Sequence, residues 1–228
     1  MMAQVVQEME RRRVFAAVDV HNNTGVNPHY ACVNRIDHRF LHLATLFSRT
    51  VVYFVRPRGV ASMAMARLCP AVTVECGQPG QRHGIDHALD YLEACLHLSE
   101  VPSHPVPPHD IDLYHTVVTI RVPESVGFGF GRQDVALDFL PDLDHLNFRE
   151  LPAGTPIAYL HADLKKPLEV TDERGRDVYD EYFAVEDGML VLKRPVMPSM
   201  FTLDTRIVRQ DCLGYLMERI ELVEDPAA

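Results

Sequence analysis

The chain has 228 residues, with 22 Lys and Arg against 32 Asp and Glu, and its formal net charge is −10 at pH 7. This acidic balance argues against a protein whose main task is to bind nucleic acid, because neutralising phosphates requires a surplus of basic residues. Hydrophobic residues make up 47% and charged residues 24% of the chain, as in folded globular proteins. No apolar run approaches the roughly 20 residues that a membrane-spanning helix needs.

The start of the chain and its cysteines indicate a reducing compartment. The first ten residues, MMAQVVQEME, lack the basic start and apolar stretch of a secretory signal, so we expect a cytoplasmic protein. The five cysteines form no C-x-x-C pair, which predicts buried free thiols rather than a disulfide framework.

The first half of the chain alternates apolar, β-branched runs with segments of helical periodicity. This alternation predicts an α/β fold, with a parallel or mixed sheet and flanking helices. In chain order we predict a helix ending over 4–13, a buried strand over 14–20, a helix within 36–48, a strand over 51–55, a short helix over 61–68, a strand over 71–75 and a helix over 81–98.

The composition changes at residues 101–110, which contain four prolines and therefore favour a linker. Beyond the linker the pattern is typical of strands separated by turn signals such as Asp187-Gly188. We predict strands over 115–122, 155–162, 182–185 and 189–194. The sequence thus predicts an α/β domain over 1–104 and a small β-rich domain over 112–228.

Polar residues follow the first predicted strand, in the sequence DVHNNTG from Asp19 to Gly25. Ligand sites of open α/β sheets lie at such carboxyl ends. Asp19 and His21 are two residues apart and would share a face of an extended strand, so that His21 could reach a metal ion while Asp19 supports it. The alternative is a polar turn that satisfies its own backbone.

A second carboxylate, Glu75, ends the apolar strand predicted over 71–75. Burying a carboxylate is costly unless it has a partner or a task, so Glu75 is a candidate general acid or base. The alternative is a strand-end glutamate that points into solvent.

The segments AAVDVHNNTG and, some fifty residues later, AVTVECGQPGQ resemble the succinylglutamate desuccinylase/aspartoacylase family, which is related to the zinc carboxypeptidases. The resemblance runs from about Val14 to Leu98 and more loosely through the second half. It implies an α/β zinc-hydrolase domain followed by a small β domain. The implied activity is cleavage of the amide bond of an N-acyl amino acid or a similar small acidic substrate.

Carried over residue by residue, the resemblance makes His21 a zinc ligand and Glu75 the group that activates water and passes its proton to the leaving amine. Asp19 and Asn22 would hold His21 in place. The resemblance places a substrate-carboxylate arginine near Arg67, although the spacing differs, and Arg56 is a neighbouring candidate.

The sequence departs from the family pattern at the first two zinc ligands. These come from an H-x-x-E motif upstream of the His21 strand, whereas the one H-x-x-E here, from His97 to Glu100, follows Glu75. A catalytic zinc ion needs three protein ligands, so the predicted site is incomplete. We therefore expect a chain that lacks the N-terminal part of the family domain and leaves one sheet edge bare, open to a partner chain or a second copy.

Two functions from different classes remain open. The first is a zinc-dependent hydrolase of small N-acyl amino acids, and the second is a truncated or degenerate relative that acts as a binding or interaction module. His83 and His87, four residues apart on one predicted helix, have a spacing that can bind metal but is equally typical of a solvated helix face.

Overall fold

The computed structural model describes residues 2–222, which divide into two compact units. Unit 1 comprises residues 2–22, Pro28–His115 and 219–222, and unit 2 comprises Asn23–Asn27 and Thr116–Glu218. The predicted domains follow the chain continuously, whereas the structure assigns the short segment after His21 to unit 2 and the end of the last strand to unit 1.

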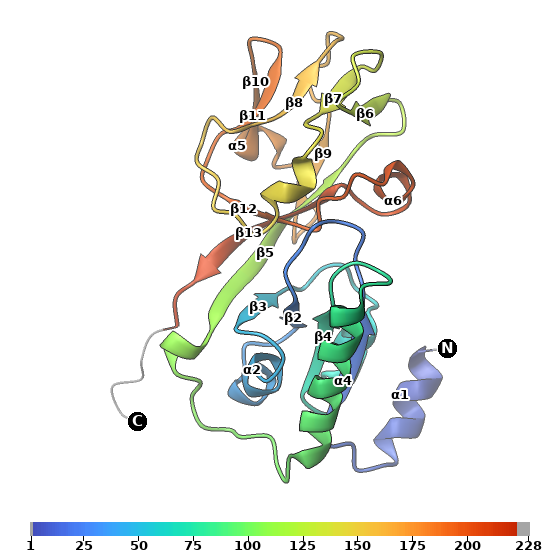
Figure 1. Ribbon diagram of the computed structural model, residues 1–228, viewed down its shortest axis with the longest axis vertical. Coiled ribbons are helices and arrows are strands. Elements are labelled where there is room, and N and C mark those ends of the chain that lie inside the picture. Colours follow the sequence, from blue (N-terminus) through green and yellow to red (C-terminus); the bar gives the residue numbers. More distant parts are fainter. Residues whose placement is uncertain (1, 223–228) are drawn as a thin grey trace. The chain divides into compact units, whose positions relative to one another are not determined.

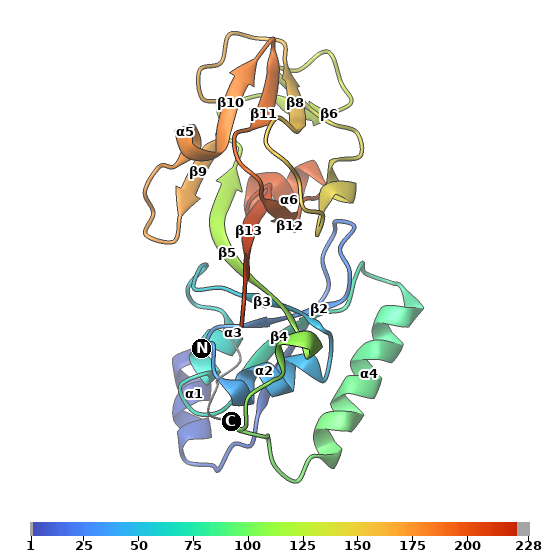
Figure 2. The same ribbon diagram turned by 90° about the vertical axis from the view of Figure 1, so that its left-hand side faces the viewer.

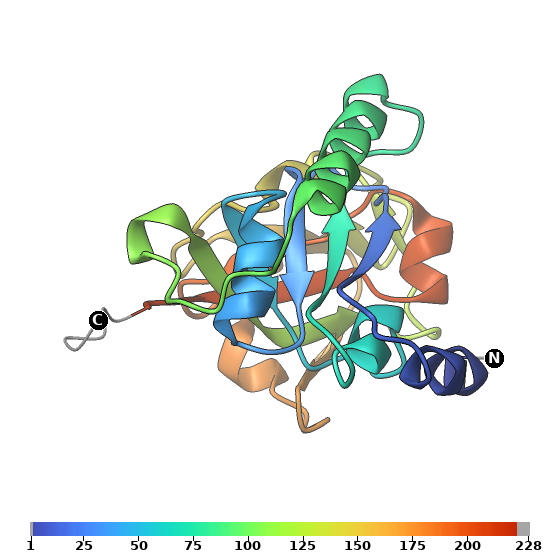
Figure 3. The ribbon, with the colours of Figure 1, turned by 90° about the horizontal axis from the view of Figure 1, so that it is seen from below.

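Unit 1 is built on five strands in the order β1-β4-β2-β3-β5. Strands β1 and β4 are parallel, β2 is antiparallel to β4, and β3 and the start of β5 are parallel to β2. Figure 3 shows β2 running opposite to its neighbour β4 and to β1, which lies on the far side of β4. The strands are β1 (Ala17–His21), β2 (Tyr30–Val33), β3 (Thr50–Tyr53), β4 (Ala71–Glu75) and β5 (Asp112–Arg121).

Helices cover both faces of this sheet. Helix α2 packs on β2, β3 and β4, whereas α3 packs on β1 and β4 and is itself contacted by α1. Figure 2 shows α1 beside α3 and away from α4. The helices are α1 (Met2–Glu10), α2 (His38–Thr45), α3 (Ala61–Met65) and α4 (Arg82–His97), and a 3-10 turn covers Pro108–Asp110.

The core of unit 1 lies between α2 and one face of the sheet. Paired strand residues share a face, so Val72 and Val74 of β4 lie beside Val33 and Ala31 of β2, all fully buried. The other face carries Thr73, whose hydroxyl is 2.9 Å from that of Ser62 in α3. Asp19, His21 and Glu75 have the parity of Thr73 and therefore lie on the α3 face.

Unit 2 contains a five-stranded sheet in the order β10-β11-β8-β7-β6, and the remainder of β5 pairs with β9 while β12 pairs with β13 (Figure 1). The β10–β11 hairpin turns at Asp187 and Gly188, both with positive φ, as a tight hairpin requires. The elements are β6 (Phe128–Phe130), β7 (Leu137–Phe139), 3-10 turn Leu143–Leu146, β8 (Pro156–Leu160), β9 (Glu169–Asp172), α5 (Tyr179–Tyr182), β10 (Phe183–Glu186), β11 (Met189–Leu192), β12 (Met197–Ser199), α6 (Thr205–Gln210) and β13 (Gly214–Ile220).

The predicted α/β class with a mixed sheet and flanking helices is confirmed. The sequence did not predict β2, a four-residue strand that reverses direction relative to β4. None of the helices described among residues 2–222 is both long and apolar enough to cross a bilayer.

Candidate functional site

The two predicted site residues His21 and Glu75 occupy paired positions at the carboxyl ends of the parallel strands β1 and β4. The amide of Cys76 donates a 2.9 Å hydrogen bond to the carbonyl of His21, which extends the pairing one residue beyond Glu75. Because paired residues of neighbouring strands lie on the same face, His21 and Glu75 occupy neighbouring positions on one face of the sheet.

Asp19 lies beside His21, as the alternation of side chains along a strand predicts. Its Oδ1 is 3.1 Å from Nε2 of His21, and the side chains are 29% and 49% exposed. When Nε2 carries a proton and donates to Asp19, the Nδ1 lone pair of neutral His21 is left available as a ligand. Asp19 thus fixes the orientation and tautomer of an accessible imidazole.

Glu75 is buried, with only 6% of the residue exposed. The alternative, a strand-end glutamate that points into solvent, is therefore wrong. Its negative charge acts on two neighbouring thiols. Burial, and after it the charge of Glu75, raises the pKa of Cys76 to about 11, and the same two causes raise the pKa of Cys32. The carboxylate thus sits in a dry environment, which suits a group that exchanges protons with a substrate.

Asn22 links the segments that follow β1 and β4, because its Nδ2 donates to the carbonyl of Gly77 at 3.1 Å. Three of the next five residues, Asn23, Thr24 and Asn27, use their side chains to hold this loop within unit 2. Asn27 donates to Asn23 Oδ1 at 2.9 Å, and Thr24 and Thr202 share a 2.7 Å hydrogen bond. Part of the DVHNNTG sequence therefore stabilises its own loop. A polar turn of this kind was the alternative to a functional site.

Asn147 holds this loop and was not predicted from the sequence. Its Nδ2 donates to the carbonyls of Val26 at 3.2 Å and Phe201 at 2.9 Å, and its Oδ1 accepts the Phe201 amide at 2.9 Å. The residue is buried. Since these partners are 121 and 54 residues away, no local motif could have revealed the contact.

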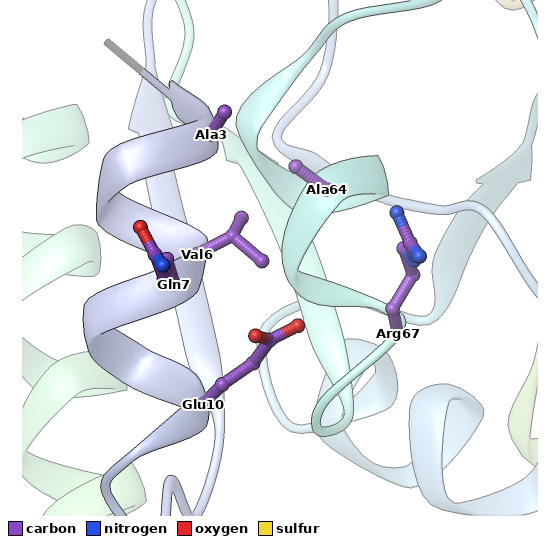
Figure 4. A pocket seen from close by; sticks show the side chains of 6 residues that line it. All are labelled: Ala3, Val6, Gln7, Glu10, Ala64 and Arg67. Carbon is purple, nitrogen blue, oxygen red and sulfur yellow. The ribbon is translucent and has the colours of Figure 1, made fainter.

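The structure does not bring Arg67 or Arg56 to His21 and Glu75. Arg67 precedes the start of β4 and lines a pocket of about 280 Å³ with residues of α1 and α3, including Glu10 (Figure 4). Glu75 lies at the other end of the strand, about 13 Å along it at ~3.3 Å per residue. Arg56 follows the end of β3. Because β3 runs opposite to β4, the carboxyl end of β3 lies beside the amino end of β4, where Arg67 is found. Their role in binding a substrate carboxylate stays a prediction.

The side chains near His21 do not complete a zinc site. A catalytic zinc ion takes three protein ligands, whereas residues 2–222 contain no group of three His, Cys, Asp or Glu side chains arranged to hold a metal. The His97–Glu100 motif begins at the last residue of α4, about 24 Å along that helix from its start after β4. The described residues thus supply one candidate zinc ligand, His21, and a nearby carboxylate.

Comparison of the sequence with protein-family models and with curated proteins gives no match. The structure, in contrast, is similar to murine aminoacylase 3, with a TM-score of 0.55 and 14% identity over 96% of this chain and 69% of that enzyme. It is also similar to succinylglutamate desuccinylase from Vibrio parahaemolyticus, with a TM-score of 0.54 and 14% identity over 99% of this chain and 60% of the other. The predicted resemblance is thus confirmed as a likeness of fold: the chain is built like most of an aminoacylase 3 or a succinylglutamate desuccinylase.

Proposed function

We propose that the chain belongs to a hydrolase that cleaves the amide bond of an N-acyl amino acid or a similar small acidic substrate. The observation that carries the proposal is the pairing of His21 with the buried Glu75 at the ends of two parallel strands. The names of the two similar structures, an aminoacylase and a desuccinylase, support the same reaction class.

Glu75 is the proton carrier of the proposed reaction. Its carboxylate accepts a proton from the water that attacks the amide carbonyl and then delivers that proton to the leaving amine nitrogen. The products are a carboxylic acid and a free amine, and the carboxylate is regenerated. A buried position strengthens its interaction with a charged transition state, because little water screens it.

His21 is the accessible partner of this carboxylate. With Asp19 holding Nε2, its Nδ1 would be one ligand of a metal ion that polarises the amide carbonyl. Because the described residues supply too few ligands for zinc, zinc dependence requires ligands from outside them. This fits a chain that spans 69% and 60% of the two similar structures.

A binding module without catalysis is the second candidate, favoured by the incomplete ligand set and by an exposed apolar surface on unit 1. The edge strand β1 exposes Val20, and α4 exposes a stripe that repeats at helical spacing. The stripe consists of Ile85, Leu89, Leu92 and Leu96. A partner chain or a second copy at this open edge is the corresponding proposal, and the mass of the purified protein in solution tests it.

Amide hydrolysis by the purified chain, with and without added zinc, separates the two candidates. We expect turnover of N-acyl amino acids and a fall of about 10²–10⁴-fold in Glu75→Gln, the usual contribution of a general acid or base. Glu93→Gln on the exposed side of α4 is the matched control and should keep full activity. No hydrolysis across N-acetyl, N-succinyl and N-aspartyl substrates would contradict catalysis by this chain and favour the binding module.

A further inference from the structure

Three histidines form a stack beside the strand end that carries Glu75. The ring of His29 lies parallel to those of His83 and His87, with centroids 5.2 Å and 5.0 Å away. Phe47 extends the stack, since its ring is 4.1 Å from that of His87 and nearly parallel to it. We call His29, His83 and His87 the histidine stack. His83 and His87, the pair four residues apart on α4, thus contact a third histidine from outside the helix, although His83 is also exposed.

Hydrogen bonds determine where the protons of the stack lie. The carbonyl of Phe47 can only accept, so Nε2 of His87, at 3.0 Å, must donate to it. Neutral His87 then accepts at Nδ1, and Nδ1 of His29 donates to it at 2.7 Å. The remaining nitrogen of His29, Nε2, is a buried lone pair without a hydrogen-bond partner.

The stack contacts the residues that follow Glu75. An added Cβ on Gly77 would lie 2.9 Å from Nε2 of His29, so the imidazole lies directly against this glycine. On α4, Gly84 lies between the two stack histidines, and an added Cβ there would be 2.1 Å from the carbonyl oxygen of Cys76. His29 and the first turn of α4 therefore hold Cys76 and Gly77 from two sides.

The charges that act on His29 come from the stack itself. Burial, followed by the imidazoles of His87 and His83, lowers the pKa of His29 from its usual value of 6.5. Gly77 and Gln81 in the β4–α4 connection and Phe47 and Ser48 after α2 are uncharged. The charged groups of α4 are the mutually bonded Arg82 and Asp86 and the exposed Asp90 and Glu93. Glu75 pairs with Tyr30 next to His29, and Arg49, which follows Ser48, is bonded to Asp112.

We propose that the histidine stack is a proton-sensitive clamp: its neutral form holds the Cys76–Gly77 strand end in place, and its protonated form releases it. A second proton on His29 would have to occupy Nε2, which is buried against Gly77 and has no hydrogen-bond partner in the closed form. It would also place a positive charge on a ring whose centroid is 5.2 Å and 5.0 Å from those of two other imidazoles. Both effects destabilise the protonated closed form, and both are absent once the strand end is released.

The direction of the pH dependence follows from the same costs. A histidine that folding keeps neutral stabilises the closed form above its usual pKa, and this contribution is lost as the pH falls below about 6.5. The clamp goes beyond the proposed reaction, because it concerns how the strand end is held whatever Glu75 does. In this inference His29 is a positioning residue.

Amide hydrogen exchange and histidine NMR of the full chain between about pH 8 and about pH 5 test the clamp. We expect His29 to titrate below the usual histidine pKa of 6.5. After correction for intrinsic rates, exchange at Cys76 and Gly84 should accelerate about tenfold for each pKa unit by which folding lowers the pKa of His29. These amides donate to His21 and Gln81 in the closed form. The readout does not depend on catalysis, so it can fail or succeed separately from the proposed function.

His29→Gln is the diagnostic variant, because its amide can still donate to His87 but carries no titrating charge. Protection of Cys76 at about pH 8 should survive in this variant, and the acceleration at low pH should disappear. His83→Phe keeps a stacked ring and should raise the pKa of His29, while His97→Gln at the exposed end of α4 should change nothing. Equal acceleration in wild type and His29→Gln, or no acceleration in the wild type, would overturn the clamp.

Discussion

His21 and Glu75 are register partners on adjacent parallel strands, so the spacing of 54 positions between them in the sequence closes to neighbouring places in the sheet. One residue is accessible and bound to Asp19, and the other is buried beside two thiols. This contrast gives the two side chains different chemical capacities: the imidazole can meet a ligand directly, and the carboxylate can exchange a proton in a dry site.

Asp19→Asn tests whether the orientation of His21 matters for function. The variant keeps the size of the side chain but weakens the bond to Nε2 of His21, so we expect activity or metal affinity to fall about 10–100-fold. The free energy of unfolding should change by less than about 1 kcal/mol, because the pair is partly exposed. Equal activity of variant and wild type would show that Asp19 does not position His21.

Gly25→Ala tests the loop that follows His21. An added Cβ would lie 1.9 Å from the backbone carbonyl oxygen of Phe201, so the loop or its partner must move. We expect a loss of about 1–3 kcal/mol in the free energy of unfolding, as for other overpacked sites. Gly127→Ala, where nothing lies within 4 Å of the new atom, is the matched control and should stay within about 0.5 kcal/mol. Urea denaturation that shows equal stability for both variants would contradict the packing of this loop.

The sequence predicted those strands and helices whose hydrophobic pattern is complete within the segment itself. Strand β4 and helix α4 were predicted almost residue for residue, because an apolar β-branched run and a helical stripe are complete within each segment. Strand β2 was missed because it has only four residues after a polar loop, too few to show a recognisable alternation of apolar and polar residues. Its direction depends on pairing with β4, which lies some forty residues later.

The residues of the candidate site likewise divide into those visible in a local pattern and those that depend on long-range contacts. His21 and Glu75 stand at strand ends and were visible as polar residues after apolar runs. Their adjacency, however, depends on the order of strands in the sheet. His83 and His87 were noted as a pair, but their contact with His29 and the bonds of Asn147 were not predictable, because each joins residues more than fifty positions apart. Arg56 lies at the other end of the strands because β3 runs opposite to β4, and Arg67 lies there because it precedes the start of β4.

Asp112→Asn tests the ion cluster at the start of β5. The carboxylate accepts from Arg49 at 2.7 Å and Arg219 at 2.9 Å, and these hydrogen bonds hold the pKa of Asp112 below its usual 3.8. A lowered pKa means that the contribution is present above that value and is lost as the pH falls through it. We expect the variant to lose about 1 kcal/mol in the free energy of unfolding near neutral pH. The difference from wild type should shrink as the pH falls from about 3.8 through the lowered pKa of Asp112, and a difference that does not shrink there would contradict the ionic origin.

The pairing of His21 with Glu75 as one working site is most directly tested by a double-mutant cycle on amide hydrolysis with His21→Ala, Glu75→Gln and the double variant. Residues that act as a unit give losses that do not multiply. We predict that the double variant is about as slow as the slower single variant. Losses that multiply fully, each single change acting regardless of the other, would show that the two side chains do not form a common centre.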